Sequence, residues 1–152
     1  MEIERKFLVN SDYDIYEIVA GKRYDLIADY YFNENTRLRY LNDKMFITTK
    51  SLGTIEREEY EFEIKPITLG LSPLLRKTRY YVPYKEHTFE VNIYNSYLAM
   101  AEINHSPLKL VEVELKNKNE EIELPPWVGD EVTNNAIYYN RNLFKFLNNS
   151  LV

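Results

Sequence analysis

Charged and apolar side chains alternate along one short segment of this sequence after another. The clearest case is the segment EYEFEI, in which Glu59, Glu61 and Glu63 alternate with Tyr60 and Phe62. Because successive side chains of a β-strand point to opposite faces, this period of two predicts strands with one ionic face and one apolar face. Segments with this pattern span residues 2–9, 23–33, 36–42, 44–51, 57–65, 75–83, 88–94 and 109–116.

Eight predicted strands and few helical segments indicate a mainly antiparallel β protein. We expect a closed, eight-stranded β-barrel with a few flanking helices, because open sheet edges would need a protection that the sequence does not supply. The pair Asn42-Asp43 indicates a tight hairpin between two of the strands. A chain of 152 residues can bury an ordinary core by itself, so we expect a single domain over residues 1–152.

Three segments have helical character. They are a stretch near residues 12–20 that Ser11 could cap, the segment SYLAMAEIN after Asn95 or Ser96, and a C-terminal helix over about 134–148 that Thr133 could cap. On the last helix, we interpret Arg141 and Lys145 as parts of an exposed polar face.

Composition excludes several classes of site. The chain has no cysteine, which leaves no thiol nucleophile. Because it also has only two histidines, any metal ion must be held by carboxylates. A net charge of -5 argues against binding of duplex nucleic acid through a basic surface. No apolar stretch approaches the roughly 20 residues that span a bilayer, so we expect neither a signal peptide nor a membrane helix, and a cytoplasmic location.

The ionic face of the predicted strands carries like charges two residues apart, such as Arg37 with Arg39 and Glu112 with Glu114. Like charges at this spacing repel by about 1 kcal/mol or more unless a counter-charge is present. The cations are Lys6, Arg37, Arg39, Lys50, Arg57, Lys77 and Arg79, and the carboxylates are Glu2, Glu4, Glu59, Glu61, Glu63, Glu90, Glu112 and Glu114.

Two interpretations of this face are open. An antiparallel sheet with a core on one side and water on the other would give the same alternation. If the sheet instead closes with its ionic face inward, the interior suits a polyanion chelated to a divalent metal ion, because Arg and Lys bind phosphate oxygens and carboxylates bind hard cations.

Several of these segments resemble the motifs of the CYTH superfamily, which includes triphosphate tunnel metalloenzymes, class IV adenylate cyclases and thiamine triphosphatases. EIERKFLV resembles the E-x-E-x-K signature, TRLRY the R-x-R strand, FITTK the T-x-K strand and REEYEFEI the acidic strand. KTRYYV resembles the K-x-R strand, FEVNIY the W-E-V-D-x-F strand and VEVEL the E-x-E-L strand. The short chain and the ELPPW segment are most similar to the bacterial inorganic triphosphatase branch, and the resemblance extends to about residue 143.

The resemblance implies an eight-stranded tunnel that hydrolyses a small-molecule triphosphate, most simply inorganic tripolyphosphate, with Mg²⁺ or Mn²⁺. The partners foreseen are the substrate and, at most, a second copy of the chain in a homodimer, with no duplex nucleic acid and no membrane. The implied catalytic residues are Lys6, Arg39, Lys77, Glu61 and Tyr31. The implied phosphate ligands are Lys6, Arg37, Arg39, Lys50, Arg57, Lys77 and Arg79. The implied metal ligands are Glu2, Glu4, Glu59, Glu61, Glu63, Glu90, Glu112 and Glu114.

This sequence departs from the family pattern in five places. Asp29 replaces a glutamine, Phe89 a tryptophan and Asn92 an aspartate, and segments 66–76 and 95–109 are remodelled. The loss of an acid at position 92 predicts weaker metal binding. Alternatives to the triphosphatase are a class IV adenylate cyclase, a thiamine triphosphatase, and a non-catalytic module that binds polyphosphate or nucleotides.

Overall fold

The computed structural model describes residues 2–51, 56–67, 74–95 and 107–149. It contains one antiparallel sheet in the order β10-β1-β9-β8-β7-β2-β3-β4-β6, with β5 paired to β1. The strands are β1 (Glu2–Val9), β2 (Tyr24–Tyr31), β3 (Thr36–Leu41), β4 (Lys44–Lys50), β5 (Glu56–Arg57), β6 (Glu59–Ile64), β7 (Leu75–Tyr84), β8 (His87–Tyr94), β9 (Lys109–Glu114) and β10 (Val128–Glu131).

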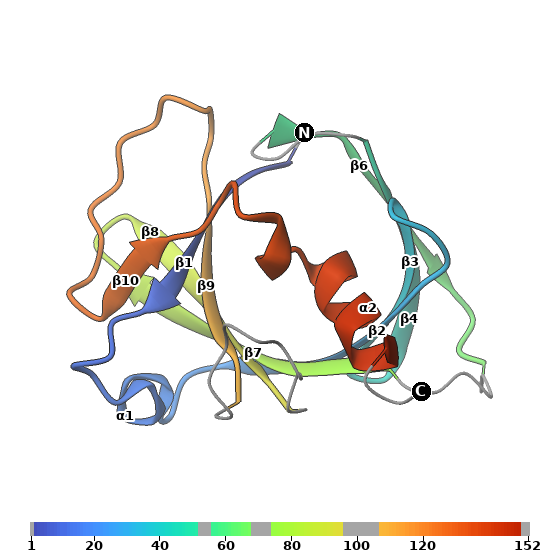
Figure 1. Cartoon of the computed structure of the whole chain (residues 1–152), viewed down its shortest axis with the longest axis horizontal. Coiled ribbons are helices and arrows are strands. Elements are labelled where there is room, and N and C mark those ends of the chain that lie inside the picture. Colours follow the sequence, from blue (N-terminus) through green and yellow to red (C-terminus); the bar gives the residue numbers. More distant parts are fainter. Residues whose placement is uncertain (1, 52–55, 68–73, 96–106, 150–152) are drawn as a thin grey trace.

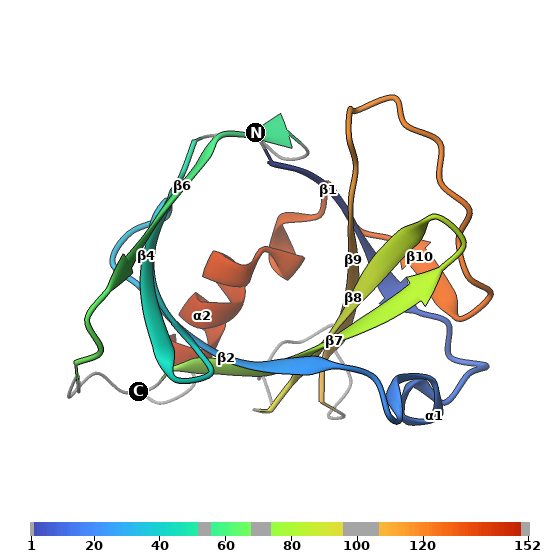
Figure 2. The same ribbon diagram turned by 180° about the vertical axis from the view of Figure 1, so that it is seen from behind.

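The sheet curves into a nearly closed barrel (Figures 1 and 2). Strand β5 is followed after one residue by β6, and its pairing with β1 joins the two ends of the sheet. This junction consists of the pairs Glu2↔Arg57 and Ile3↔Glu56. The predicted antiparallel barrel is therefore confirmed, although one predicted strand is divided into β5 and β6, and β10 was not predicted.

The larger apolar core lies outside the barrel, against the outer face of β1, β7, β8 and β9. Helix α1 (Ile15–Val19) covers this face together with Trp127 (Figure 1). Phe89 and Val91 are buried there. The outer face of β6 differs from that of β8, because Phe62 is 64% exposed. The outward-facing apolar side chains of the strands thus form a core on one side of the barrel only.

A second apolar cluster closes one end of the barrel interior, which we call the lumen. Leu75 and Leu110 each lie two residues from a lumen-facing charged residue of the same strand, so they share its face. Helix α2 (Asn140–Asn149) packs Leu143, Phe144 and Leu147 against this cluster. The helix lies within the outline of the barrel when the molecule is seen as in Figure 1. One end of the lumen is therefore covered by α2.

The helix ends differ from the prediction. Asp14, not Ser11, caps α1, because its Oδ1 accepts a hydrogen bond from the Tyr16 amide at 3.0 Å. The predicted C-terminal helix begins later, at Asn140, after the 3₁₀ turn η1 (Ala136–Tyr138). Thr133 is not its cap, because its hydroxyl accepts a hydrogen bond from the Lys6 amide. The predicted helix in SYLAMAEIN lies outside the described residues.

No described helix combines the length and the apolar character needed to cross a membrane.

Candidate active site in the lumen

The charged side chains on the inward face of the strands line a cavity of about 280 Å³ in the lumen. Glu63 alone among the predicted site residues does not line it, and this side chain is exposed to solvent. The predicted residues that line the cavity are Glu2, Glu4, Lys6, Tyr31, Arg37, Arg39, Lys50, Arg57, Glu59, Glu61, Lys77, Arg79, Glu90, Glu112 and Glu114. The ionic face is thus gathered inside the barrel, and the interpretation as a solvated outer face is wrong.

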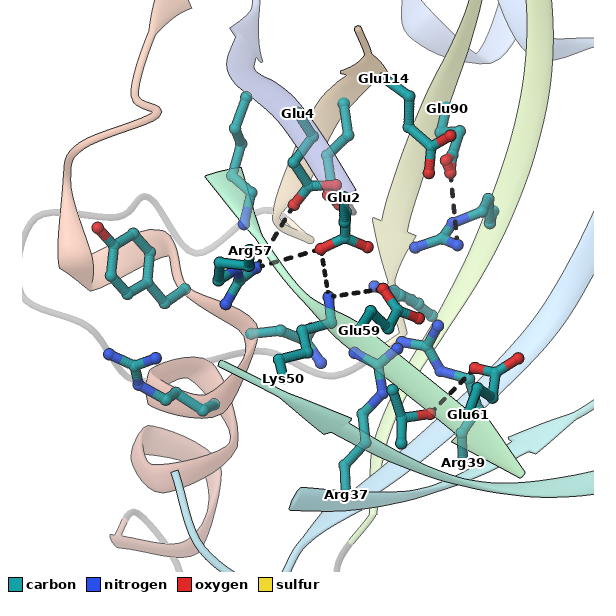
Figure 3. A pocket seen from close by; sticks show the side chains of 18 of the residues that line it. Glu2, Glu4, Arg37, Arg39, Lys50, Arg57, Glu59, Glu61, Glu90 and Glu114 are labelled. Carbon is teal, nitrogen blue, oxygen red and sulfur yellow. Dashed lines mark hydrogen bonds and ion pairs between the residues drawn. The ribbon is translucent and has the colours of Figure 1, made fainter. Parts of the chain in front are cut away.

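Near the junction of β1 and β5, the carboxylates are paired with cations (Figure 3). Lys50 Nζ lies 2.8 Å from Glu2 Oε1 and 3.7 Å from Glu59 Oε2. The Arg57 guanidinium lies 3.6 Å from Glu2 and 3.9 Å from Glu4. In this arrangement, predicted phosphate ligands and predicted metal ligands neutralise each other.

Further along the lumen, Arg39 is bound by a carboxylate that the sequence did not mark as a site residue. Asp29 is fully buried and accepts hydrogen bonds from Arg39 Nε and Nη2, both at 2.8 Å. Although burial opposes ionisation, the Arg39 guanidinium holds the pKa of Asp29 well below its ordinary value. Asn140 donates hydrogen bonds to Asp29 Oδ2 at 2.9 Å and to the Tyr31 hydroxyl at 2.7 Å. Arg39 is therefore held in one position, and this position is connected to α2.

Asn92 is fully buried between two charged residues on neighbouring strands. Its Oδ1 accepts a hydrogen bond from Arg79 Nε at 2.9 Å, and its Nδ2 donates one to Glu112 Oε1 at 2.8 Å. Arg79 also lies 3.4 Å from Glu90. Both polar atoms of the Asn92 amide are thus used within the protein, and its carbonyl oxygen is directed at a guanidinium.

Burial in the lumen lowers the pKa of one group, Lys77, and raises the pKa of another, Glu4. Burial lowers the pKa of Lys77 well below its ordinary value, and the nearby charges of Arg79 and Arg39 lower it further. Burial and the charge of Glu112 raise the pKa of Glu4 to about 8. An amine that loses its proton readily and a carboxylate that keeps one are the kind of groups that proton transfer requires.

The donor chemistry of the lumen fits a hard divalent cation, because the available ligands are carboxylate oxygens. Glu2 and Glu59 both approach Lys50 Nζ, at 2.8 and 3.7 Å, and the charge of Glu112 acts on Glu4. Carboxylates that gather in this way can also share a cation. Among the described residues, however, no group of three acidic or histidine side chains is arranged to hold a metal ion. A cation at Glu2 and Glu4 would have to replace Lys50 and Arg57.

The sequence pattern missed several residues that contact the site, among them Asp29, Asn140 and Arg141. Asp29 lies two residues before Tyr31 on β2, so the two side chains point to the same face of the strand. The alternation was therefore sufficient to place Asp29 in the lumen. Asn140 and Arg141 line the cavity from α2, and a pattern of strands gives no information on where a helix docks. The interpretation of Arg141 as part of an exposed helical face is therefore wrong, whereas Lys145 is exposed as expected.

Comparisons with known proteins agree with this architecture. No family model matches the chain. An inorganic triphosphatase of Acetivibrio thermocellus is 34% identical over 157 residues, which cover 95% of this chain and 93% of the relative. An inorganic triphosphatase of Nitrosomonas europaea is 33% identical over 155 residues, which cover 93% and 95%.

Solved structures give the same result. The crystal structure of an inorganic triphosphatase is 30% identical and superposes with a TM-score of 0.60, covering 93% of this chain and 96% of that chain. A conserved hypothetical protein from Pyrococcus furiosus is 20% identical with a TM-score of 0.51, covers 78% of this chain and 81% of that chain, and shows a shared fold only.

Proposed function

This chain belongs to the inorganic triphosphatase family, and on that premise we propose that it hydrolyses inorganic tripolyphosphate with the help of a divalent metal ion. The observation that carries the proposal is the convergence of seven predicted cations from five strands, β1, β3, β4, β5 and β7, on one cavity that also contains carboxylates. Phosphoryl transfer requires charge neutralisation and in-line positioning more than covalent catalysis, and the cations of this cavity support the neutralisation.

In the proposed reaction, the oxygen of a water molecule forms a bond to a terminal phosphorus, and the bond to the bridging oxygen breaks. The bridging oxygen leaves with the electron pair as part of diphosphate. Arg39 and Arg79 are held in place by Asp29 and Asn92, so they can bind the phosphate oxygens without reorganisation. Lys77 is the proposed acceptor of the proton that the water loses, because burial lowers the pKa of its amine.

In this proposal, Glu2, Glu4 and Glu112 would hold Mg²⁺ or Mn²⁺ by moving closer together than they lie in the structure. The bound cation would supply neutralisation of the charge on the phosphate oxygens. The substrate's other oxygens would then bind Lys50 and Arg57, which are released from their ion pairs with these carboxylates.

The test is a substrate panel in which phosphate release is measured with tripolyphosphate, ATP and thiamine triphosphate, each with Mg²⁺ or Mn²⁺. We expect the fastest release from tripolyphosphate and none without a divalent metal ion. Chromatography of the ATP reaction would detect cyclic AMP, which would favour the cyclase. Calorimetric binding of tripolyphosphate without release of phosphate from any substrate would contradict the proposal and favour a non-catalytic module.

A further inference from the structure

The cavity ends at α2, close to two arginine side chains, Arg37 and Arg141. Arg37, on β3, is buried, and Arg141, on α2, is half-buried. Both line the cavity, and among the described residues neither buried Nε has a hydrogen-bond partner. A buried N–H group without an acceptor costs free energy, so an acceptor from a ligand is the simplest way to satisfy both.

These two arginines also differ from the others in charge compensation. Arg39, Arg57 and Arg79 each form an ion pair with a carboxylate in the lumen. Within the part of the chain that the structure describes, Arg37 and Arg141 form none. The nearby carboxylate of Glu34 is bound instead by Lys145, at 3.1 Å. The α2 end of the cavity therefore carries two positive charges that no carboxylate neutralises directly.

The backbone that presents Arg141 is fixed to the lumen wall. Lys6 Nζ donates a hydrogen bond to the Tyr138 carbonyl oxygen at 3.0 Å. The Asn140 side chain makes three hydrogen bonds, to Asp29, Tyr31 and Tyr94. The Arg141 guanidinium lies over the Tyr139 ring, 5.1 Å from its centroid. The side chain is thus preorganised, and binding an anion costs little conformational entropy.

We propose that Arg141 and Arg37 form an anion subsite that binds an end phosphate of the substrate, so that α2 takes part in substrate recognition. This inference rests on the proposed function, because the ligand is the triphosphate itself. Helix α2 covers this end of the lumen, so that a phosphate bound here is the end of its chain. An end phosphate carries more negative charge than an internal one, which matches two uncompensated cations.

The experiment is calorimetric titration of the protein with tripolyphosphate in EDTA, so that binding is measured without turnover. We expect Arg141→Gln to weaken binding at least tenfold, because one charge-assisted contact is lost. Lys44→Gln is the matched control: it removes the same charge at an exposed position in the β3–β4 hairpin, outside the cavity lining, and should change affinity less than twofold. Equal affinities of the two variants would overturn the inference.

Cyclic trimetaphosphate distinguishes an end-binding subsite from a general electrostatic effect. It carries three phosphates but no chain end. We expect Arg141→Gln to leave its affinity unchanged, or wild-type protein not to bind it measurably. An equal loss for the cyclic and the linear ligand would contradict the subsite. Unfolding temperatures of both variants should match, since an Arg141 variant that binds weakly because it misfolds would melt earlier.

The two proposals can fail separately. If Arg141→Gln binds tripolyphosphate more weakly than wild type but wild type releases no phosphate with any metal, the proposed hydrolysis is wrong and the subsite stands. If Arg141→Gln binds tripolyphosphate as tightly as Lys44→Gln while wild-type protein hydrolyses it, the subsite is wrong and the hydrolysis stands.

Discussion

Asn92 holds two oppositely charged neighbours with one amide group. Its oxygen accepts from Arg79 and its nitrogen donates to Glu112, so a neutral residue that both accepts and donates is needed here. The sequence alone suggested instead that position 92 was a metal ligand weakened by the loss of an acid. The structure gives this residue a positioning role, which changes the expected effect of a substitution.

We expect Asn92→Asp to destabilise the metal-free protein by about 1–3 kcal/mol, because the donor to Glu112 is replaced by a second buried carboxylate. Added Mg²⁺ or Mn²⁺ should recover part of this loss, since a cation can bind between two carboxylates. The measurement is thermal unfolding in EDTA and at increasing metal concentration. Asn95→Asp, at an exposed position, is the control. Identical unfolding curves for the Asn92 variant and wild type would contradict this role.

Asp29 fixes Arg39, and its removal should affect both stability and turnover. We expect Asp29→Asn to lose about 3–5 kcal/mol of stability at pH 7, because the Arg39 guanidinium stays buried without its carboxylate. We also expect turnover to fall by tenfold or more, since Arg39 is no longer held in place. Urea unfolding and phosphate release measure the two effects, and Asp43→Asn in the exposed hairpin is the control.

The same variant has a predictable dependence on pH. Because the pKa of Asp29 in the folded protein is lowered from 3.8, its carboxylate stabilises the fold fully above about pH 4. This contribution is lost as the pH falls further. The difference in stability between wild type and Asp29→Asn should therefore be smaller at pH 3 than at pH 7. A constant difference would show that the Asp29 charge does not stabilise the fold.

Most strands could be predicted because their period of two extends over six or more residues. Strand β1 has the predicted bounds, and Asn42 turns the β3–β4 hairpin with a φ of 54°, as the Asn42-Asp43 pair indicated. Strand β10 was missed because VGDE is too short to show a period. It also depends on a contact far along the chain, since a Cβ at Gly129 would lie 3.0 Å from the Val9 backbone.

Helix boundaries were harder to predict than strands because several polar residues near each end could serve as caps. Asp14 and Ser11 are both good N-cap residues, and only the folded geometry selects Asp14. Thr133 precedes an apolar run as a cap would, but its hydroxyl is bonded to the Lys6 amide on β1. Tertiary contacts of this kind cannot be read from the local sequence.

At the scale of the whole molecule, the barrel encloses the ionic face of its strands and has its larger apolar core on the outside. The sequence could indicate the two faces but not which one is enclosed. Like-charge pairs such as Arg37 with Arg39 favoured an enclosed ionic face, and the cavity confirms it. The roles of the lining residues as phosphate ligands, metal ligands or catalysts stay predictions, as does a homodimer. The docking of α2 over one end of the lumen could not be predicted, because it depends on packing between Leu143 and distant strands.

The short junction between β1 and β5 has a consequence for local opening. Two residue pairs join the ends of the sheet, and Arg57 on β5 and Lys6 on β1 both face the cavity. Before ligand binds, amide protons of β5 should exchange with solvent faster than those of β4 or β9, which are paired on both sides. A triphosphate bound to both cations would cross-link the junction and slow this exchange. Hydrogen–deuterium exchange with and without tripolyphosphate measures this, and unchanged rates in β5 would show that the ligand does not bridge the two strands.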